Sequence, residues 1–199
     1  MRTATKDTIK LPPPRLKGSI SLEEAIRARR SRRSFSEKAL TQEQISQLLW
    51  SCQGITDQRS GFRAVPSAGA LYPLEVYALT KDGLFHYIPE GHMLQAASSE
   101  DMRGALCDAA WGQGLVRQAA LDIVICAVYS RIASRYGERG VRYTDMEAGH
   151  AGQNVSLQAA ALGLGSCMVG AFDPKEVAKL LGLPKDEEPL YIIPVGYPK

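Results

Sequence analysis

Apolar residues recur at helical spacing in the first quarter of the chain. From Ile45 onward they fall at positions i, i+3, i+4 and i+7, which form one face of a helix. Thr41 and Gln44 precede this face as a capping box, and Ser21 and Glu24 repeat the same signature before a shorter helix. The residues that we expect this shorter helix to bury are Leu22, Ala25 and Ile26.

Further helices are predicted in the second half of the chain. A third capping box, formed by Thr144 and Glu147, predicts the longest helix, which would run from there to Leu162. This helix is rich in alanine and glycine, and small residues allow another helix to approach closely. We therefore expect it at the centre of the fold or of a dimer. A shorter helix is expected over residues 99–111, and Asp173–Pro174 is a strong helix start.

Three segments have the pattern of β-strands. Residues 74–80 alternate, and the turn at 81–83 leads into a second strand at 84–88, so a hairpin is predicted. Residues 121–129 are almost continuously apolar, as in a strand that is buried on both faces. The final strand, 190–195, contains a proline, which favours a sheet edge or a strand end.

The order of these elements is irregular, and this favours an α+β fold over a doubly wound α/β fold. The chain has 199 residues, of which 45% are hydrophobic and 23% charged, as is typical of one globular domain. Residues 1–18 are polar and rich in proline, so we expect an extended N-terminal arm before a single domain at 19–199. No apolar run approaches the length of a membrane span or a secretory signal.

The net charge is only +3, but the positive charge is concentrated in one segment. Five arginines lie within seven residues: Arg27, Arg29, Arg30, Arg32 and Arg33. Three interpretations are open, namely a solvated face, a nucleic-acid contact, and a site for one phosphorylated cofactor. The absence of lysine and the interleaved serines favour directed hydrogen bonds over diffuse charge, because guanidinium groups bind phosphate in a bidentate manner.

Two loops of small residues could contact a flat ligand through their backbone. One spans residues 66–73 and is bounded by prolines; its alternative interpretation is an ordinary tight connection. The other spans residues 163–173 and holds three glycines, but it matches neither a dinucleotide-binding fingerprint nor a phosphate-binding P-loop. Its alternative interpretation is a helix end at Gly163 followed by a short strand.

The sequence offers no hydrolytic triad and no metal-ligand motif. The four cysteines are far apart and three lie in apolar contexts, so we interpret them as small buried hydrophobes in a reducing, cytoplasmic setting. Loops suited to a cofactor, without an array of acids, bases and nucleophiles, indicate that a bound cofactor supplies the chemistry.

Taken in order, these segments resemble the FMN-dependent nitroreductase superfamily, and most closely its SagB-type, azoline-forming dehydrogenase branch. The cues are the arginine motif at 29–33, the loop at 66–73, residues 147–154 leading into 162–165, and the ending at 194–198. The resemblance covers residue 20 to the C-terminus. It implies a mostly antiparallel central sheet flanked by helices, in an intertwined homodimer with a long central helix.

The resemblance also implies which residues bind FMN. Those that would hold its phosphate, its ribityl chain and the pyrimidine edge of its ring are Arg29, Arg30, Ser31 and Arg33. Those that would line the flavin from the partner subunit are Pro66, Ser67, Ala68 and Gly69. Those that would pack beside the ring are Met168, Val169 and Gly170.

The resemblance implies ping-pong reduction of a small acceptor, such as a nitroaromatic compound or a quinone, with NAD(P)H as electron donor. Azoline oxidases of this branch use a Lys–Tyr pair as base, whereas the similar place here is Arg142–Tyr143. Arginine cannot act as a base near neutral pH, which favours a stand-alone reductase. An azoline-type or flavin-consuming enzyme that uses O₂, and a basic nucleic-acid-binding module, are the alternatives.

Overall fold

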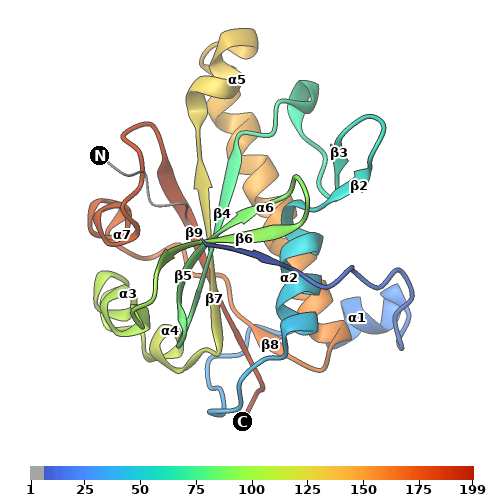
Figure 1. Ribbon diagram of the computed structural model, residues 1–199, viewed down its shortest axis with the longest axis vertical. Coiled ribbons are helices and arrows are strands. Elements are labelled where there is room, and N and C mark those ends of the chain that lie inside the picture. The colour runs from blue at the N-terminus through green and yellow to red at the C-terminus, as the bar shows by residue number, and fades with distance from the viewer. Residues whose placement is uncertain (1–6) are drawn as a thin grey trace.

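The computed structural model describes residues 7–199. Its centre is a seven-stranded sheet in the order β1-β6-β5-β4-β7-β9-β8, in which every neighbouring pair is antiparallel (Figure 1). The strands of this sheet are β1 (Thr8–Lys10), β4 (Leu74–Thr80), β5 (Gly83–Ile88), β6 (Met93–Ser98), β7 (Leu121–Ala127), β8 (Gly165–Ser166) and β9 (Glu188–Gly196). A separate small hairpin joins β2 (Ile55–Asp57) to β3 (Phe62–Arg63).

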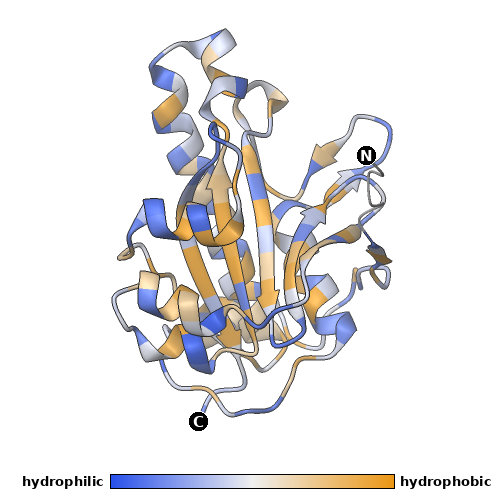
Figure 2. Ribbon diagram, turned by 60° about the vertical axis from the view of Figure 1, so that its left-hand side comes forward, coloured by the Kyte–Doolittle hydropathy of each residue, from blue (hydrophilic) through white to orange (hydrophobic). Residues whose placement is uncertain are grey.

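Helices cover both faces of the sheet. They are α1 (Leu22–Ala28), α2 (Gln42–Gln53), α3 (Arg103–Ala109), α4 (Gly114–Gln118), α5 (Tyr129–Tyr136), α6 (Arg139–Ala161) and α7 (Pro174–Leu181). The core shared with α2 and α6 contains Ile123 and Ile125 of β7, while the core shared with α3, α4 and α7 contains Val124 and Cys126. Figure 2 shows the apolar strands between these helical layers. The predictions of an α+β fold and of a strand buried on both faces are confirmed.

The predicted hairpin is confirmed, because β4 pairs with β5 and Thr80 stands opposite Gly83. The prediction that a proline puts the last strand at the sheet edge is wrong, because β9 lies between β7 and β8. Ile192 exchanges both backbone hydrogen bonds with Val169, on the β8 side. Two residues later in β9, the backbone nitrogen and carbonyl of Pro194 also point to the β8 side. The N–H that proline lacks is therefore not needed for pairing with β7.

The longest helix, α6, begins earlier than its sequence pattern indicates. Thr144 is buried inside the helix, where its hydroxyl donates to the carbonyl of Gly140 at 3.0 Å. Glu147 is also buried, so the predicted capping box does not exist. No side chain caps the true start at Arg139, which left no sequence signal. The predicted end is confirmed, since Gly163 follows α6 with φ +70°.

Two other expectations about helices need correction. Both predicted caps of α1 and α2 are present, but in α1 only Ala25 is buried, whereas Leu22 and Ile26 are 61% and 54% exposed. The helix predicted over residues 99–111 is only the shorter α3, and a second short helix that was not predicted, α4, follows it. Trp111 and Gly112 separate them, with φ +55° and +76°.

The N-terminal segment adds a strand that was not expected. Thr8–Lys10 pairs with β6, and the following residues run along α2, where Ser46 Oγ donates to the Pro12 carbonyl at 2.6 Å. Residues 1–6 of the predicted arm lie outside the described residues. All four cysteines are buried and free. Within residues 7–199, no helix is long and apolar enough to cross a membrane, and no cluster of His, Cys, Asp and Glu is suited to hold a metal.

Candidate functional site

The arginine motif follows the end of α1 and is fixed to the edge of the sheet. Ser31 forms a parallel bridge with Ser166 of β8, and the Arg32 N–H donates to the Ser166 carbonyl at 2.9 Å. A Cβ added to Gly165 would lie 2.7 Å from Arg32 Cβ, so this approach requires glycine. The backbone of the motif is therefore held in place, while its side chains face outward.

The five arginines of this segment leave an unneutralised positive surface. Within residues 7–199 no carboxylate forms a salt bridge with any of them. Arg30 instead donates to the carbonyls of Arg27 and Arg29, at 3.0 and 2.7 Å, which closes the end of α1. A group of exposed guanidiniums without acidic partners is suited to bind an anion.

The segment after β8 starts next to the arginine motif, at Ser166, and then continues along β9. Val169 pairs with Ile192 of β9, and Gly170 is exposed. Met168 Sδ would be 2.8 Å from a Cβ added to Gly152 of α6. Since Cys167 is the only residue between Ser166 and Met168, the fold brings the arginine and methionine segments of the predicted site together.

The third predicted segment is a strained loop. It contains a 3₁₀ turn, η1 (Ala68–Ala70), and φ is positive at Gly69, Ala70 and Tyr72 (64°, 55° and 46°). Ser67 Oγ accepts a hydrogen bond from the Tyr72 N–H at 2.9 Å, which closes the loop. Residues other than glycine that are held at positive φ are concentrated at functional sites.

Within one chain, this loop and the arginine motif lie at different places along α6. The Pro66–Gly69 loop contacts Tyr136 of α5 and lies beside Glu147, near the start of α6. The arginine motif meets Ser166, whose hydroxyl lies 3.3 Å from that of Ser156, near the helix end. Positions 147 and 156 are nine steps apart along the helix, or about 14 Å.

A buried polar network lies beneath the loop and was missed by the sequence analysis. Glu147 is 2% exposed, and its Oε1 accepts from Gln53 Nε2 at 3.4 Å, while Oε2 has no hydrogen-bond partner among the described residues. Arg63 Nη1 donates to Gln53 Oε1 at 3.2 Å, and Arg63 also pairs with Glu90.

Burial raises the pKa of Glu147 to about 7, against the opposing effects of the Ser67 hydroxyl, Gln53 and Arg63. The carboxyl therefore changes its charge near neutral pH. The available signal was its spacing: Glu147 lies four residues before the buried Ala151, and therefore on the same side of the helix.

Comparison with known proteins identifies the family. The model of the nitroreductase family matches residues 26–197, which is most of the chain. The protein belongs to the nitroreductase family. This nitroreductase-family protein is therefore an oxidoreductase with the nitroreductase-like fold, as its sequence predicted.

Individual relatives agree with this assignment. A candidate nitroreductase of Methanocaldococcus jannaschii is 40% identical over 196 residues, which is 96% of this chain and 97% of the relative. The crystal structure of a candidate nitroreductase from Ralstonia eutropha JMP134 superposes with a TM-score of 0.88 at 29% identity, covering 99% of this chain and 92% of that one. The microcin B17-processing protein McbC of Escherichia coli is 27% identical over 150 residues, or 70% of this chain and 55% of its own.

Proposed function

We propose that this nitroreductase-family protein is an FMN-dependent oxidoreductase that works as a homodimer. NAD(P)H would reduce it, and a small acceptor such as a nitroaromatic compound or a quinone would reoxidise it, in a ping-pong cycle. The observation that carries the proposal is that the arginine motif, which forms no salt bridge among residues 7–199, is fixed to Ser166, two residues before the segment 168–170 that ends at the exposed Gly170.

The residues present fit FMN. Its phosphate needs planar, bidentate donors, and the exposed arginine motif supplies them without competing carboxylates. Its flat ring needs a close backbone approach, and Gly170 offers it beside Met168 and Val169. When bound, FMN would supply the redox chemistry, accepting and donating hydride at N5, which no side chain of the chain can do.

Each segment then has a distinct part in holding the cofactor. The residues that would bind the phosphate, the ribityl chain and the pyrimidine edge are Arg29, Arg30, Ser31 and Arg33. Met168 and Val169 would pack against the ring, and the backbone of Gly170 would lie near N5. A guanidinium at the pyrimidine edge stabilises negative charge there, so this motif would also favour the reduced cofactor.

A second copy of the chain would complete the site with its Pro66–Gly69 loop. The loop and the arginine motif of one chain lie at different places along α6, and we assign the loop of each site to the partner copy, as the family resemblance implies. Exposed apolar side chains support such a contact. They lie on the segment before α1, on α1 itself and on the outer face of α6: Leu16, Ile20, Leu22, Ile26, Val141 and Met146.

The test is a titration of the purified protein with FMN, followed by flavin absorbance after removal of free ligand. Arg29→Ala and Arg33→Ala are each expected to weaken FMN binding by about tenfold or more, because a charge-assisted hydrogen bond is lost. Arg117→Ala on α4, where Arg117 pairs with Asp108 on the other face of the sheet, is the matched control. Unchanged FMN affinity in both site variants would reject the assigned roles.

The relative McbC favours one second candidate, an azoline-type dehydrogenase or oxidase. Against it stands Arg142 at the place of the lysine, because arginine cannot serve as a base near neutral pH. Oxygen uptake with NADH, compared with turnover of added quinone or nitro compound, separates these functions. A reductase turns over the added quinone or nitro compound faster than it consumes O₂. An oxidase consumes O₂ at the same rate whether or not that acceptor is present.

A further inference from the structure

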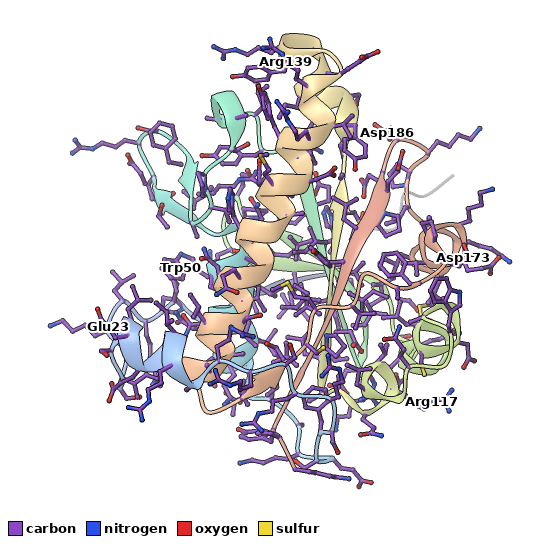
Figure 3. The ribbon with its side chains drawn as sticks, turned by 180° about the vertical axis from the view of Figure 1, so that it is seen from behind. Glu23, Trp50, Arg117, Arg139, Asp173 and Asp186 are labelled. Atoms are coloured by element: carbon purple, nitrogen blue, oxygen red, sulfur yellow. The ribbon has the colours of Figure 1, made fainter. Side chains whose placement is uncertain are left out.

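The corner where α5 meets α6 carries a cluster of exposed arginines and half-buried tyrosines. The cluster consists of Arg135, Tyr136, Arg139, Arg142 and Tyr143. The two tyrosine rings meet edge to face, with centroids 5.3 Å apart. Arg135 lies over the Tyr136 ring and Arg142 over the Tyr143 ring, each with its guanidinium carbon 5.7 Å from the ring centroid. Figure 3 shows Arg139 at the exposed start of α6.

The positive charge of this cluster is not neutralised by its neighbours. In the part of the chain that the structure describes, no carboxylate lies within 4.0 Å of any of its three guanidiniums. The nearby acid Asp145 already accepts a hydrogen bond from Tyr129 at 3.0 Å. Glu138 stands four residues before Arg142 and Asp145 three residues after it, yet neither carboxylate forms an ion pair with the cluster.

The corner is rigidly attached to the strained loop of the proposed site. A Cβ on Gly69 would lie 3.0 Å from Tyr136 Oη and 3.1 Å from Arg135 Nη1, so the cluster touches the loop. Arg131 of α5 pairs with Glu75 of β4 and donates to the Tyr72 carbonyl at 3.3 Å. These bonds tie α5 both to the sheet and to the end of the loop.

The chemistry of the cluster fits a flat ligand that carries an anionic group. Tyrosine rings offer faces and edges for stacking, and guanidinium groups bind carboxylate or phosphate through paired N–H donors. Arginine already stacked on a ring is partly ordered before it binds, so little side-chain entropy is lost. A neutral quinone or nitroaromatic compound would leave these guanidiniums unused.

We propose that this α5–α6 corner determines substrate specificity by selecting planar substrates with an anionic group. The inference rests on the proposed function, because the loop that the corner touches would line the flavin of the partner subunit. Two substrates share this chemistry: an electron donor with a phosphate on its adenosine, as in NADPH, and an acceptor that is an aromatic carboxylate. The two half-reactions of a ping-pong cycle separate them.

The experiment uses FMN-loaded protein and rapid mixing with matched pairs of substrates. NADPH is compared with NADH for reduction, and 4-nitrobenzoate with 4-nitrobenzyl alcohol for reoxidation. The wild-type protein is expected to prefer the anionic member of at least one pair by about tenfold or more. Arg135→Gln combined with Arg142→Gln is expected to bring that preference below about threefold, without changing the FMN affinity.

Arg117→Gln is the charge-matched control, since Arg117 lies on α4, far from Arg139 and the corner in Figure 3. Calorimetric binding of benzoate against benzyl alcohol, and of adenosine 2′,5′-bisphosphate against AMP, measures the same preference without turnover. A wild-type protein that takes up no FMN overturns the proposed function and this inference with it. A protein that binds FMN but prefers neither anion, or keeps its preference in the double variant, overturns this inference alone.

Discussion

Replacing Glu147 with Gln would remove a buried titrating carboxyl while keeping its shape. The amide oxygen of the new side chain can accept from Gln53 Nε2, as Oε1 of Glu147 does at 3.4 Å. Its amide nitrogen would take the place of Oε2, which has no hydrogen-bond partner among the described residues. The substitution therefore changes mainly the charge that the site carries at neutral pH.

The expected effect follows from the pKa of Glu147, which burial raises from 4.5 to about 7. Between these two values the folded protein binds more protons than the unfolded chain, so its free energy of unfolding falls as the pH rises. A shift of about 2.5 pKa units corresponds to about 3 kcal/mol. Relative to wild type, Glu147→Gln should therefore gain about 3 kcal/mol of stability between pH 4.5 and pH 8.

The assay is chemical denaturation of both proteins at one protein concentration over this pH range. Asp122, whose pKa burial also raises, is present in both proteins, so its contribution cancels in the difference. Glu100→Gln, which changes an exposed carboxyl, should run parallel to wild type. A difference between Glu147→Gln and wild type that stays constant with pH would refute the burial argument.

Three further substitutions test the packing around the site and one helix end. Gly165→Ala puts a Cβ 2.7 Å from Arg32 Cβ, so the arginine motif must move. Chemical denaturation should show a loss of about 1–3 kcal/mol of stability, and FMN binding should weaken. Gly152→Ala meets the flexible end of Met168 instead, so FMN affinity should fall while stability changes by less than about 1 kcal/mol. Asp173→Ala removes hydrogen bonds of 2.9 and 3.1 Å to the first turn of α7, and denaturation should show a loss of about 1 kcal/mol with FMN binding unchanged.

Local signals in the sequence were enough to predict the elements that they control. The caps of α1, α2 and α7 depend on side chains within three residues of each other, and all are present. The β4–β5 hairpin depends on one short turn, and β7 shows its burial in an unbroken apolar run. In these cases the residues that determine the structure lie next to one another in the chain.

The errors arose where distant contacts decide the outcome. Thr144 imitates a cap, but it is inside α6 because Gly140 lets α5 pack closely; a Cβ there would be 2.8 Å from Ile132 Cγ2. Pro194 is tolerated in an inner strand because β8 is only two residues long. Neither fact can be read from the neighbouring sequence.

The candidate site also contains some features that depend on neighbouring residues and others that depend on distant contacts. The arginine motif was recognisable from its composition and residues 168–170 from the family resemblance, and the fold connects the two through Ser166. The separation of the Pro66–Gly69 loop from the arginine motif depends on the part of α6 between Glu147 and Ser156, and the network of Gln53, Arg63 and Glu147 joins three elements. No spacing in the sequence reveals either feature.

The most direct measurement is the flavin absorbance and the mass of the protein after FMN is added and free ligand is removed. The account expects a yellow dimer with one FMN bound per chain, since each site would use the arginine motif of one copy and the loop of the other. A colourless protein, or a monomer that binds FMN as tightly as the dimer, would contradict it.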